Sequence, residues 1–285
     1  MFGRKTLTEK IIYTFMFILF SAFALSYLYI FFWGIMSSLK DHASIIITPF
    51  ALPQNPNFHV FIDVFREFSV NETGFWMMTF NSMWFSIIPA AGGILFCAML
   101  SYVTTKYKFF GAKAYYYVSF VVMLLPIYSS GGAAYKLIYN LGLTNSYIYV
   151  ILGFGGLGAT YMFFAAFYKN LSWSYAEAAF IDGANDWEVF FKIMLPQSIP
   201  MLGALFLLAW MGAWNSYDAQ LLYLPEIPTL AVGIYLYDFN MRYNPAKGRS
   251  YLIAACMISC IPTLAMFIAF NNVMMSNISL GGIKE

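Results

Sequence analysis

The sequence predicts an all-α membrane protein that crosses the lipid bilayer with six transmembrane helices. Of the 285 residues, 61% are hydrophobic and only 10% are charged, whereas soluble domains have roughly 25% charged residues. A water-soluble fold of this composition would expose large apolar patches, so we expect lipid to surround the chain. Two further observations support this class: a series of long charge-free stretches, and an uneven distribution of lysine and arginine between the loops.

Six charge-free stretches are long enough to cross a membrane. Each exceeds the ~20 apolar residues that a transmembrane helix needs. Backbone polar groups cannot remain unpaired in lipid, which favours helices for all six segments. We therefore predict a single transmembrane domain over residues 1–285, with spans at about 11–39, 75–104, 114–135, 147–168, 199–222 and 251–276.

Basic residues predict which loops face the cytoplasm. The loop after span two contains Lys106, Lys108 and Lys113 without an acidic residue, and the segment before span one is also basic. The loop 40–72 has two basic and four acidic residues. The positive-inside rule then places the N-terminus and the second loop in the cytoplasm. Because six is an even number of spans, we expect the C-terminus and the loop 169–198 in the cytoplasm as well.

The sequence shows no pattern of a metal, cofactor or nucleic-acid site. The three cysteines (Cys97, Cys256 and Cys260) lie in apolar stretches, and His42 and His59 lie far apart in one loop. A net charge of +2 does not suggest nucleic acid as a partner. An ion-coupled carrier should have ionisable groups at mid-membrane depth, and an enzyme should have them clustered. Both classes remain alternatives that the charge-free stretches disfavour.

The loop between spans four and five predicts two short helices joined by a glycine. For the first helix, Ser174 is the expected N-cap and Glu177 completes a capping box three residues later. The helix should extend to Asp182, with Gly183 in the left-handed conformation after it.

The second helix of this loop has its own boundary signals. Asn185 is the expected N-cap, with Glu188 at the third helical position. Pro196 should end the helix, and Pro200 suits the first turn of span five.

The same loop resembles the EAA loop of binding-protein-dependent importer permeases. The matching positions, each at the spacing of that pattern, are Glu177, Ala178, Ala179, Gly183, Ile193, Leu195 and Pro196. The resemblance implies that the loop is a cytoplasmic coupling-helix elbow that contacts an ATPase. The residues that it assigns to this coupling role are Glu177, Ala178, Ala179, Asp182 and Gly183.

The resemblance also implies partners and a location. A permease of this family pairs with a homologous second permease subunit, two cytosolic ATPase subunits and an extracytoplasmic solute-binding protein, in the bacterial inner membrane. These 285 residues contain no glycine-rich phosphate loop followed by Lys-Ser or Lys-Thr. We therefore expect this chain to be a transport subunit without a cofactor or catalytic residues, with ATP bound by its partners.

Shorter motifs are similar to those of carbohydrate importers of the maltose type. These are Ser38-Leu39-Lys40, Asn81-Ser82, Lys108-Phe109-Phe110-Gly111, Leu141-Gly142-Leu143, Trp214-Asn215 and the tail Gly281-Gly282-Ile283-Lys284. The tail resembles that of the group's second permease subunit. Two departures, Trp173-Ser174 before the EAA helix and Asn271-Asn272 in the last span, leave the solute open. The same machinery with a cargo other than a sugar remains the main alternative.

Candidates for the solute pathway lie near the outer end of span five. Sugars bind against aromatic faces, with polar groups that fix their hydroxyls. The residues that combine these properties are Trp214, Asn215, Tyr217 and Asp218. Asp218 is an acidic residue that adjoins the outer end of span five, although a location at the membrane interface would also explain it.

Overall fold

The computed structural model describes residues 6–125, 131–241 and 248–275. The tail motif 281–284 lies outside this range, as do parts of the third and last expected spans. The described chain is mostly helical, with one short hairpin, in agreement with the predicted class. It divides into two compact units, Met1–Phe68 with Leu236–Ile261, and Ser69–Tyr235 with Pro262–Glu285. We describe each unit by itself.

The first unit begins with a long apolar helix. Its helices are α1 (Leu7–Ser38), α2 (His42–Ile47) and α3 (His59–Glu67), with the later part of α13 (Leu230–Met241) and the earlier part of α14 (Gly248–Met275). In α1, none of the most apolar window is buried by the chain itself. An apolar helix that is exposed all round needs lipid or another subunit to cover it.

The loop 40–72 is ordered by short helices and local hydrogen bonds, and it contains no long helix. The Lys40 ammonium donates to the carbonyl oxygens of Thr48 and Pro49, at 2.9 Å and 3.0 Å. His42 accepts a hydrogen bond on Nδ1 from the backbone N–H of Arg249. This contact gives His42 a structural role at the start of α14.

The second unit contains the remaining elements. They are β1 (Ser69–Val70), β2 (Thr73–Gly74), α4 (Phe75–Lys106), α5 (Ala112–Leu124), α6 (Gly131–Asn140), η1 (Tyr147–Gly153), α7 (Ala159–Asn170), α8 (Ser174–Ile181), α9 (Asp186–Glu188), η2 (Val189–Met194), α10 (Leu195–Gln197), α11 (Ile199–Asn215) and α12 (Asp218–Tyr223). The two strands pair antiparallel, with Ser69 opposite Gly74. Asn71 and Glu72 both have positive φ, as a tight hairpin turn requires.

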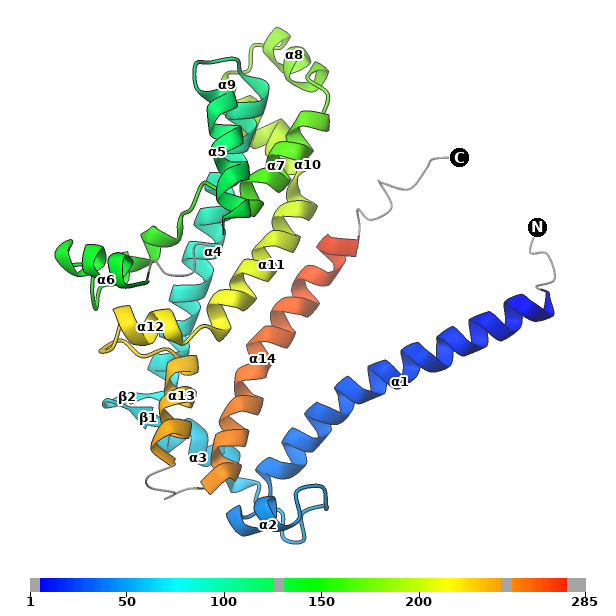
Figure 1. The fold of residues 1–285 in the computed structure, drawn as a ribbon, viewed down its shortest axis with the longest axis vertical. Helices are drawn as coiled ribbons and strands as arrows, with labels where there is room; N and C mark the ends of the chain where they lie inside the picture. The colour runs from blue at the N-terminus through cyan, green and yellow to red at the C-terminus, as the bar shows by residue number, and fades with distance from the viewer. Residues whose placement is uncertain (1–5, 126–130, 242–247, 276–285) are drawn as a thin grey trace. The chain divides into compact units, whose positions relative to one another are not determined.

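Helix α4 is the centre of the second unit, where it packs against α7, α11 and η1 (Figure 1). Glycines allow these close approaches. A Cβ on Gly93 would lie 3.0 Å from the carbonyl oxygen of Gly153, and one on Gly153 would lie 2.5 Å from Cβ of Pro89. Small residues at such contacts let helix backbones approach in a membrane. Close packing therefore explains Gly93 of span two and Gly153 of span four.

The structure interrupts the fourth expected span. Residues 154–158 separate η1 from α7, and Gly158 has φ +91°. Neighbouring side chains satisfy the carbonyl groups that the break leaves free: Cys97 Sγ donates to Gly155, and Tyr115 OH donates to Gly156. Such breaks are tolerated within a membrane where protein covers the backbone. Length and hydropathy alone did not indicate this break.

Helices long and apolar enough to cross a membrane are found at α1, α4 and α14 in the described residues. A fourth candidate is the bent pair Asp186–Gln197 and Ile199–Asn215, whose two parts meet at 74°. Within the third expected span, helix α5 ends at Leu124, and residues 126–130 lie outside the described range. Six spans therefore remain a prediction.

Candidate functional site

The first helix of the loop between α7 and α11 is α8, which begins at Ser174. This is one residue earlier than predicted, because Ser174 was the expected N-cap. Trp173 is the N-cap of α8, and its carbonyl oxygen accepts from the N–H groups of Ala176 and Glu177. Ser174 instead bonds to Ser172 through its hydroxyl and its backbone N–H. The predicted capping box of Ser174 and Glu177 is therefore wrong, because Ser174 already lies inside the helix.

Helix α8 has one face toward the core and one toward solvent. Ala176 and Ala179 are buried, at 0% and 7% exposure, in a cluster shared with α4, α7 and η2. Glu177 and Ala178 are exposed, and Ile181 is 86% exposed. Alanines on the inner face let α8 lie close to the core, while the outer face is available to a partner.

The turn after α8 has the predicted glycine geometry. Gly183 has φ +87°, and its N–H donates to the carbonyl oxygen of Phe180. The N–H of Ala184 donates to Ala179. This pair of bonds is a Schellman motif, in which glycine adopts the left-handed conformation without a Cβ penalty. Asp182 and Gly183 are both exposed, so four of the five predicted coupling residues are accessible and Ala179 is not.

The second helix of the loop has the predicted start and an unexpected continuation. Asn185 and Glu188 form the expected capping box. Lys192 Nζ donates a hydrogen bond to Glu188 Oε1 at 2.8 Å, and this bond lowers the pKa of the Glu188 carboxyl. The helix continues through the π-helical segment η2 and then α10, and it ends at Gln197, one residue after the predicted stop at Pro196.

The bend falls at Ser198, where α10 ends and α11 begins. Pro200 lies in the first turn of α11, as predicted. Ser198 is buried, and its hydroxyl lies 3.2 Å from that of Tyr168 in α7. The loop is thus attached to α7 at this end as well as through Ala176 and Ala179.

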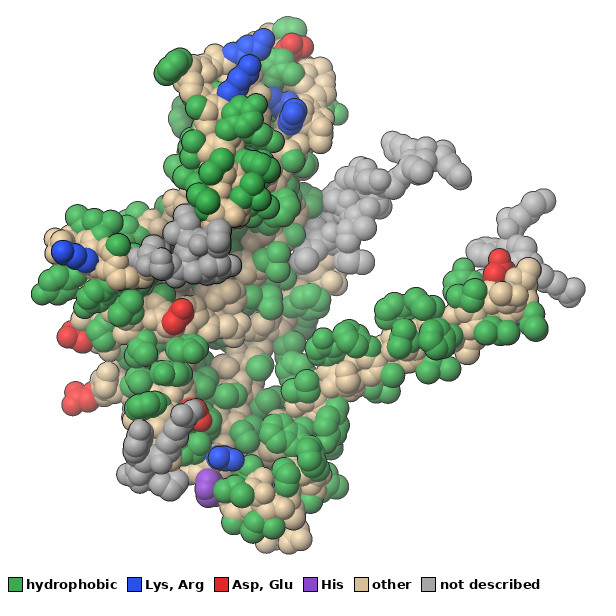
Figure 2. Space-filling view, in the orientation of Figure 1, with side chains coloured by type: hydrophobic (Ala, Val, Ile, Leu, Met, Phe, Trp, Pro, Cys, Tyr) green, Lys and Arg blue, Asp and Glu red, His purple; other side chains and the backbone are tan. Residues whose placement is uncertain are grey.

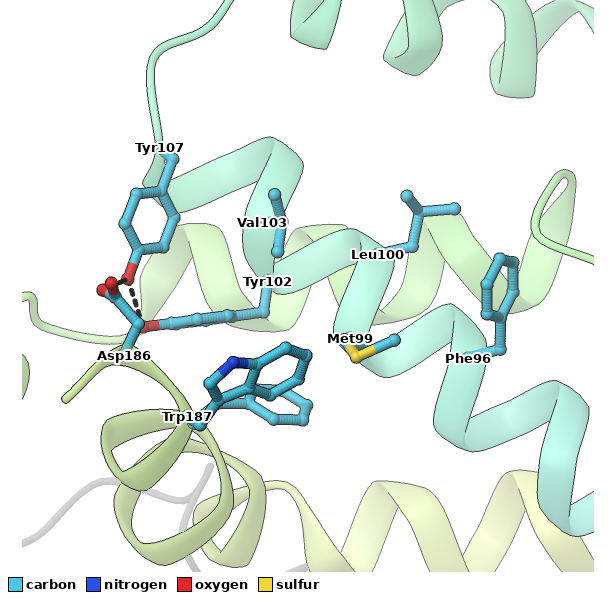
Figure 3. Close-up of a pocket in the computed structure, with 9 residues that line it drawn as sticks. Phe96, Met99, Leu100, Tyr102, Val103, Tyr107, Asp186 and Trp187 are labelled. Atoms are coloured by element: carbon cyan, nitrogen blue, oxygen red, sulfur yellow. Dashed lines mark hydrogen bonds between the residues drawn. The ribbon is translucent and has the colours of Figure 1, made fainter.

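The C-terminal end of α4 contacts the loop 169–198 at two places, one near its start and one near its middle. Tyr107 OH donates to Asp186 Oδ1 at 2.6 Å, and Lys106 donates to the carbonyl oxygen of Leu171. Beside these contacts lies a largely apolar cavity of about 440 Å³ (Figure 3). Sequence reasoning did not find Tyr107 or Asp186, because partners 79 residues apart leave no periodic signal.

Basic side chains gather at the same end of the second unit. Lys106, Lys169 and Lys192 lie in the last turns of α4, α7 and η2. Figure 2 shows lysine side chains at the end of this unit that holds α8 and α9. Such a concentration of lysine beside apolar helices is typical of a cytoplasmic membrane surface.

The predicted pathway residues have local partners. Trp214 is buried and stacks on Trp210, with ring centroids 5.3 Å apart. Asn215 donates to the carbonyl oxygen of Met211, and Tyr217 stacks on Tyr235 at 4.4 Å. Asp218 accepts from the hydroxyl of Ser216. Asn215, Tyr217 and Asp218 are exposed, whereas the chain itself covers Trp214.

A helical membrane protein with an EAA-type loop of this form belongs to the class of transporter permeases. Residues 93–274 match the family described as the binding-protein-dependent transport system inner membrane component. The chain belongs to this family, and the predicted family is confirmed.

Relatives in several bacteria have similar lengths. The diacetylchitobiose uptake system permease protein NgcG of Streptomyces coelicolor is 26% identical, over 88% of this chain and 82% of the relative. The arabinooligosaccharides transport system permease protein AraQ of Halalkalibacterium halodurans is 28% identical, over 79% and 78%. The maltose/maltodextrin transport system permease protein MalG of Yersinia pestis is 27% identical, over 72% and 69%.

A solved structure has the same fold. It is a chain from a bacterial ABC transporter involved in the import of the acidic polysaccharide alginate. The two chains superpose with a TM-score of 0.77 at 20% sequence identity, over 95% of this chain and 99% of the other.

Proposed function

We propose that this chain is one of two permease subunits of an ATP-driven importer for a sugar or oligosaccharide. The observation that supports this most directly is the exposed outer face of α8, in the loop that matches the EAA pattern of its family. A helix held rigidly on its inner face and open on its outer face suits a contact with a moving partner. The partners proposed are a homologous second permease, two cytosolic ATPases and an extracytoplasmic solute-binding protein.

The packing of α8 supports a mechanical role. Its inner face belongs to the same buried cluster as α4 and α7, so a displacement of α8 would displace those helices too. Packed interiors transmit such movements because they have low compressibility. In our proposal, an ATPase that moves Glu177 and Ala178 thereby shifts α4 and α7 between two arrangements as a rigid body.

The names of the relatives support a carbohydrate as the solute. Three of these names refer to diacetylchitobiose uptake, arabinooligosaccharides transport and maltose/maltodextrin transport. One similar relative, from Salmonella typhi, is named for sn-glycerol-3-phosphate, which keeps a cargo other than a sugar as the second candidate. Within the proposed pathway, the exposed Asn215, Tyr217 and Asp218 are better placed to meet a solute than the buried Trp214.

The solute can be tested through the binding protein that works with this chain. In a calorimetric screen of sugars, oligosaccharides, sugar phosphates and peptides, we expect an oligosaccharide to bind most tightly. Uptake of the same compound by cells should be lost when the gene for this chain is deleted. Tight binding of a peptide or a phosphate ester alone would contradict a carbohydrate cargo while leaving the importer class intact.

We also propose that the loop 169–198 faces the cytoplasm and the loop 40–72 faces outward. In a cysteine-free background, cysteines at Ser69 and Ser174 should be labelled from opposite sides of the membrane, since both positions are exposed. A membrane-impermeant maleimide applied to intact cells should modify Ser69→Cys alone. It should modify Ser174→Cys only in inverted vesicles. Labelling of both positions from outside would disprove this topology.

A further inference from the structure

One side chain at the end of α4 contacts both helices of the loop 169–198, which we call the coupling loop after its proposed role. Tyr107 is the C-cap of α4, and its hydroxyl donates to Asp186, the first residue of α9. Its ring meets that of Trp173, the N-cap of α8, edge to face at 5.7 Å. The ring of Trp173 in turn lies beside that of Phe180 in α8, with ring centroids 6.1 Å apart. Tyr107 thus links the last turn of α4 to the start of each loop helix.

The second loop helix packs on α4 mainly at one place, where the buried rings of Tyr102 and Phe190 lie with their centroids 5.2 Å apart. Next to this contact lies a pocket of about 440 Å³, whose walls include Met99 and Val103 from α4 and Trp187 from α9. Side chains that face this space lose the dispersion contacts that packed neighbours would give them. Figure 3 shows the Tyr107 hydroxyl beside the Asp186 carboxylate at the edge of this pocket. Their hydrogen bond adds a directional contact between α4 and α9 to the packing of Tyr102 on Phe190.

The chemistry of the pair suits a permanent link. Burial and the hydrogen bond to Asp186 both raise the pKa of the Tyr107 hydroxyl, so the group remains a donor throughout the physiological pH range. A carboxylate acceptor makes a stronger hydrogen bond than a neutral one. The nearby bond from Lys106 to the carbonyl oxygen of Leu171 attaches the same turn of α4 to the beginning of the loop.

We propose that Tyr107 is a positioning residue that fixes the second helix of the coupling loop against α4. In this role Tyr107 keeps the loop and α4 at a fixed distance, so that a movement of α8 also moves α4. Tyr107 itself need not touch the ATPase or the solute. The inference rests on the proposed coupling function of the loop. It adds a residue outside the EAA pattern to the parts that determine how much transport each ATP yields.

The variant Tyr107→Phe tests this, because it keeps the ring and its contacts with Trp173 and removes only the hydroxyl. We expect the reconstituted complex to assemble in normal amounts and to hydrolyse ATP at the basal rate. The ratio of solute transported to ATP hydrolysed should fall about three- to tenfold, which is less than the loss of a buried hydrogen bond to a charged group would cause, because Asp186 is exposed.

Tyr115→Phe is the matched control. The Tyr115 hydroxyl also makes a 2.6 Å bond within this unit, but its acceptor is the carbonyl oxygen of Gly156, away from the coupling loop. We expect this variant to keep the wild-type ratio. Asp186→Ala should lower the ratio about as much as Tyr107→Phe. The double variant should be no worse than Asp186→Ala, because the two substitutions remove the same hydrogen bond.

Three results would overturn the proposal: an unchanged ratio in Tyr107→Phe, an equal loss in Tyr115→Phe, or additive losses in the double variant. A lower yield of assembled complex with a normal ratio would likewise show that Tyr107 serves folding alone. Glu177→Lys, measured in parallel, separates this proposal from the one on which it rests. If Glu177→Lys abolishes transport while Tyr107→Phe has no effect, only the positioning role fails.

Discussion

A complex that contains Glu177→Gln should assemble in the membrane and transport its solute about ten- to a hundredfold more slowly than the wild type. In the part of the chain that the structure describes, the Glu177 carboxylate makes no hydrogen bond or ion pair, and it is exposed on the outer face of α8. It is therefore free to pair with a basic residue of the ATPase. A hydrogen bond to a charged group is worth roughly 1.5–3 kcal/mol, which corresponds to this loss.

The structure makes this test sharper than the sequence did. From the sequence, Glu177 had two candidate roles, in a capping box and in the contact with the ATPase. Since α8 begins at the Trp173 cap without a side-chain cap bond, the capping of this helix does not depend on the Glu177 carboxylate. Glu177→Lys should therefore be worse than Glu177→Gln, because it places a like charge against the partner's basic residue while α8 remains folded.

Glu188→Gln is the control for a change of charge in the same loop. Its ion pair with Lys192 is exposed, and glutamine also serves in a capping box. Exposed ion pairs contribute little, so we expect transport within about twofold of the wild type. The measurement is uptake of labelled solute by proteoliposomes with equal amounts of complex. Wild-type transport by Glu177→Gln would leave only the shape of the loop as its coupling feature.

The purified chain by itself should show no ATP binding or hydrolysis. A phosphate-binding loop uses backbone N–H groups of a glycine-rich turn and a lysine to hold the phosphates, and the 285 residues contain no such sequence. Hydrolysis should appear only when the second permease and the ATPase subunits are added. It should rise further when the binding protein is supplied with its solute.

Release of inorganic phosphate from reconstituted vesicles measures this directly. The matched control is the same assembly with ATPase subunits whose phosphate-loop lysine is replaced, which should reduce hydrolysis to the background of the chain alone. Hydrolysis by a pure preparation of this chain, at a rate that survives repeated purification, would contradict its assignment as a permease subunit.

The sequence by itself determined the class of protein and part of the local geometry of the loop 169–198. Composition requires lipid as the surrounding medium, because 61% hydrophobic residues cannot be buried within a soluble fold of this size. Gly183 and the capping box of Asn185 and Glu188 were predicted correctly. Such features depend on backbone conformation and on residues three or four positions apart, so the local sequence contains the information that specifies them.

Only the tertiary structure decided which face of each element is used. Ala178 and Ala179 are equivalent in the motif, but α4, α7 and η2 cover Ala179 and leave Ala178 exposed. The break of span four persists because Cys97 and Tyr115, from α4 and α5, satisfy the carbonyl groups that it frees. The bond between Tyr107 and Asp186 joins residues far apart in the chain. Burial, compensation of broken backbone bonds and long-range pairing all depend on which elements become neighbours, and a periodic pattern in one segment does not contain that information.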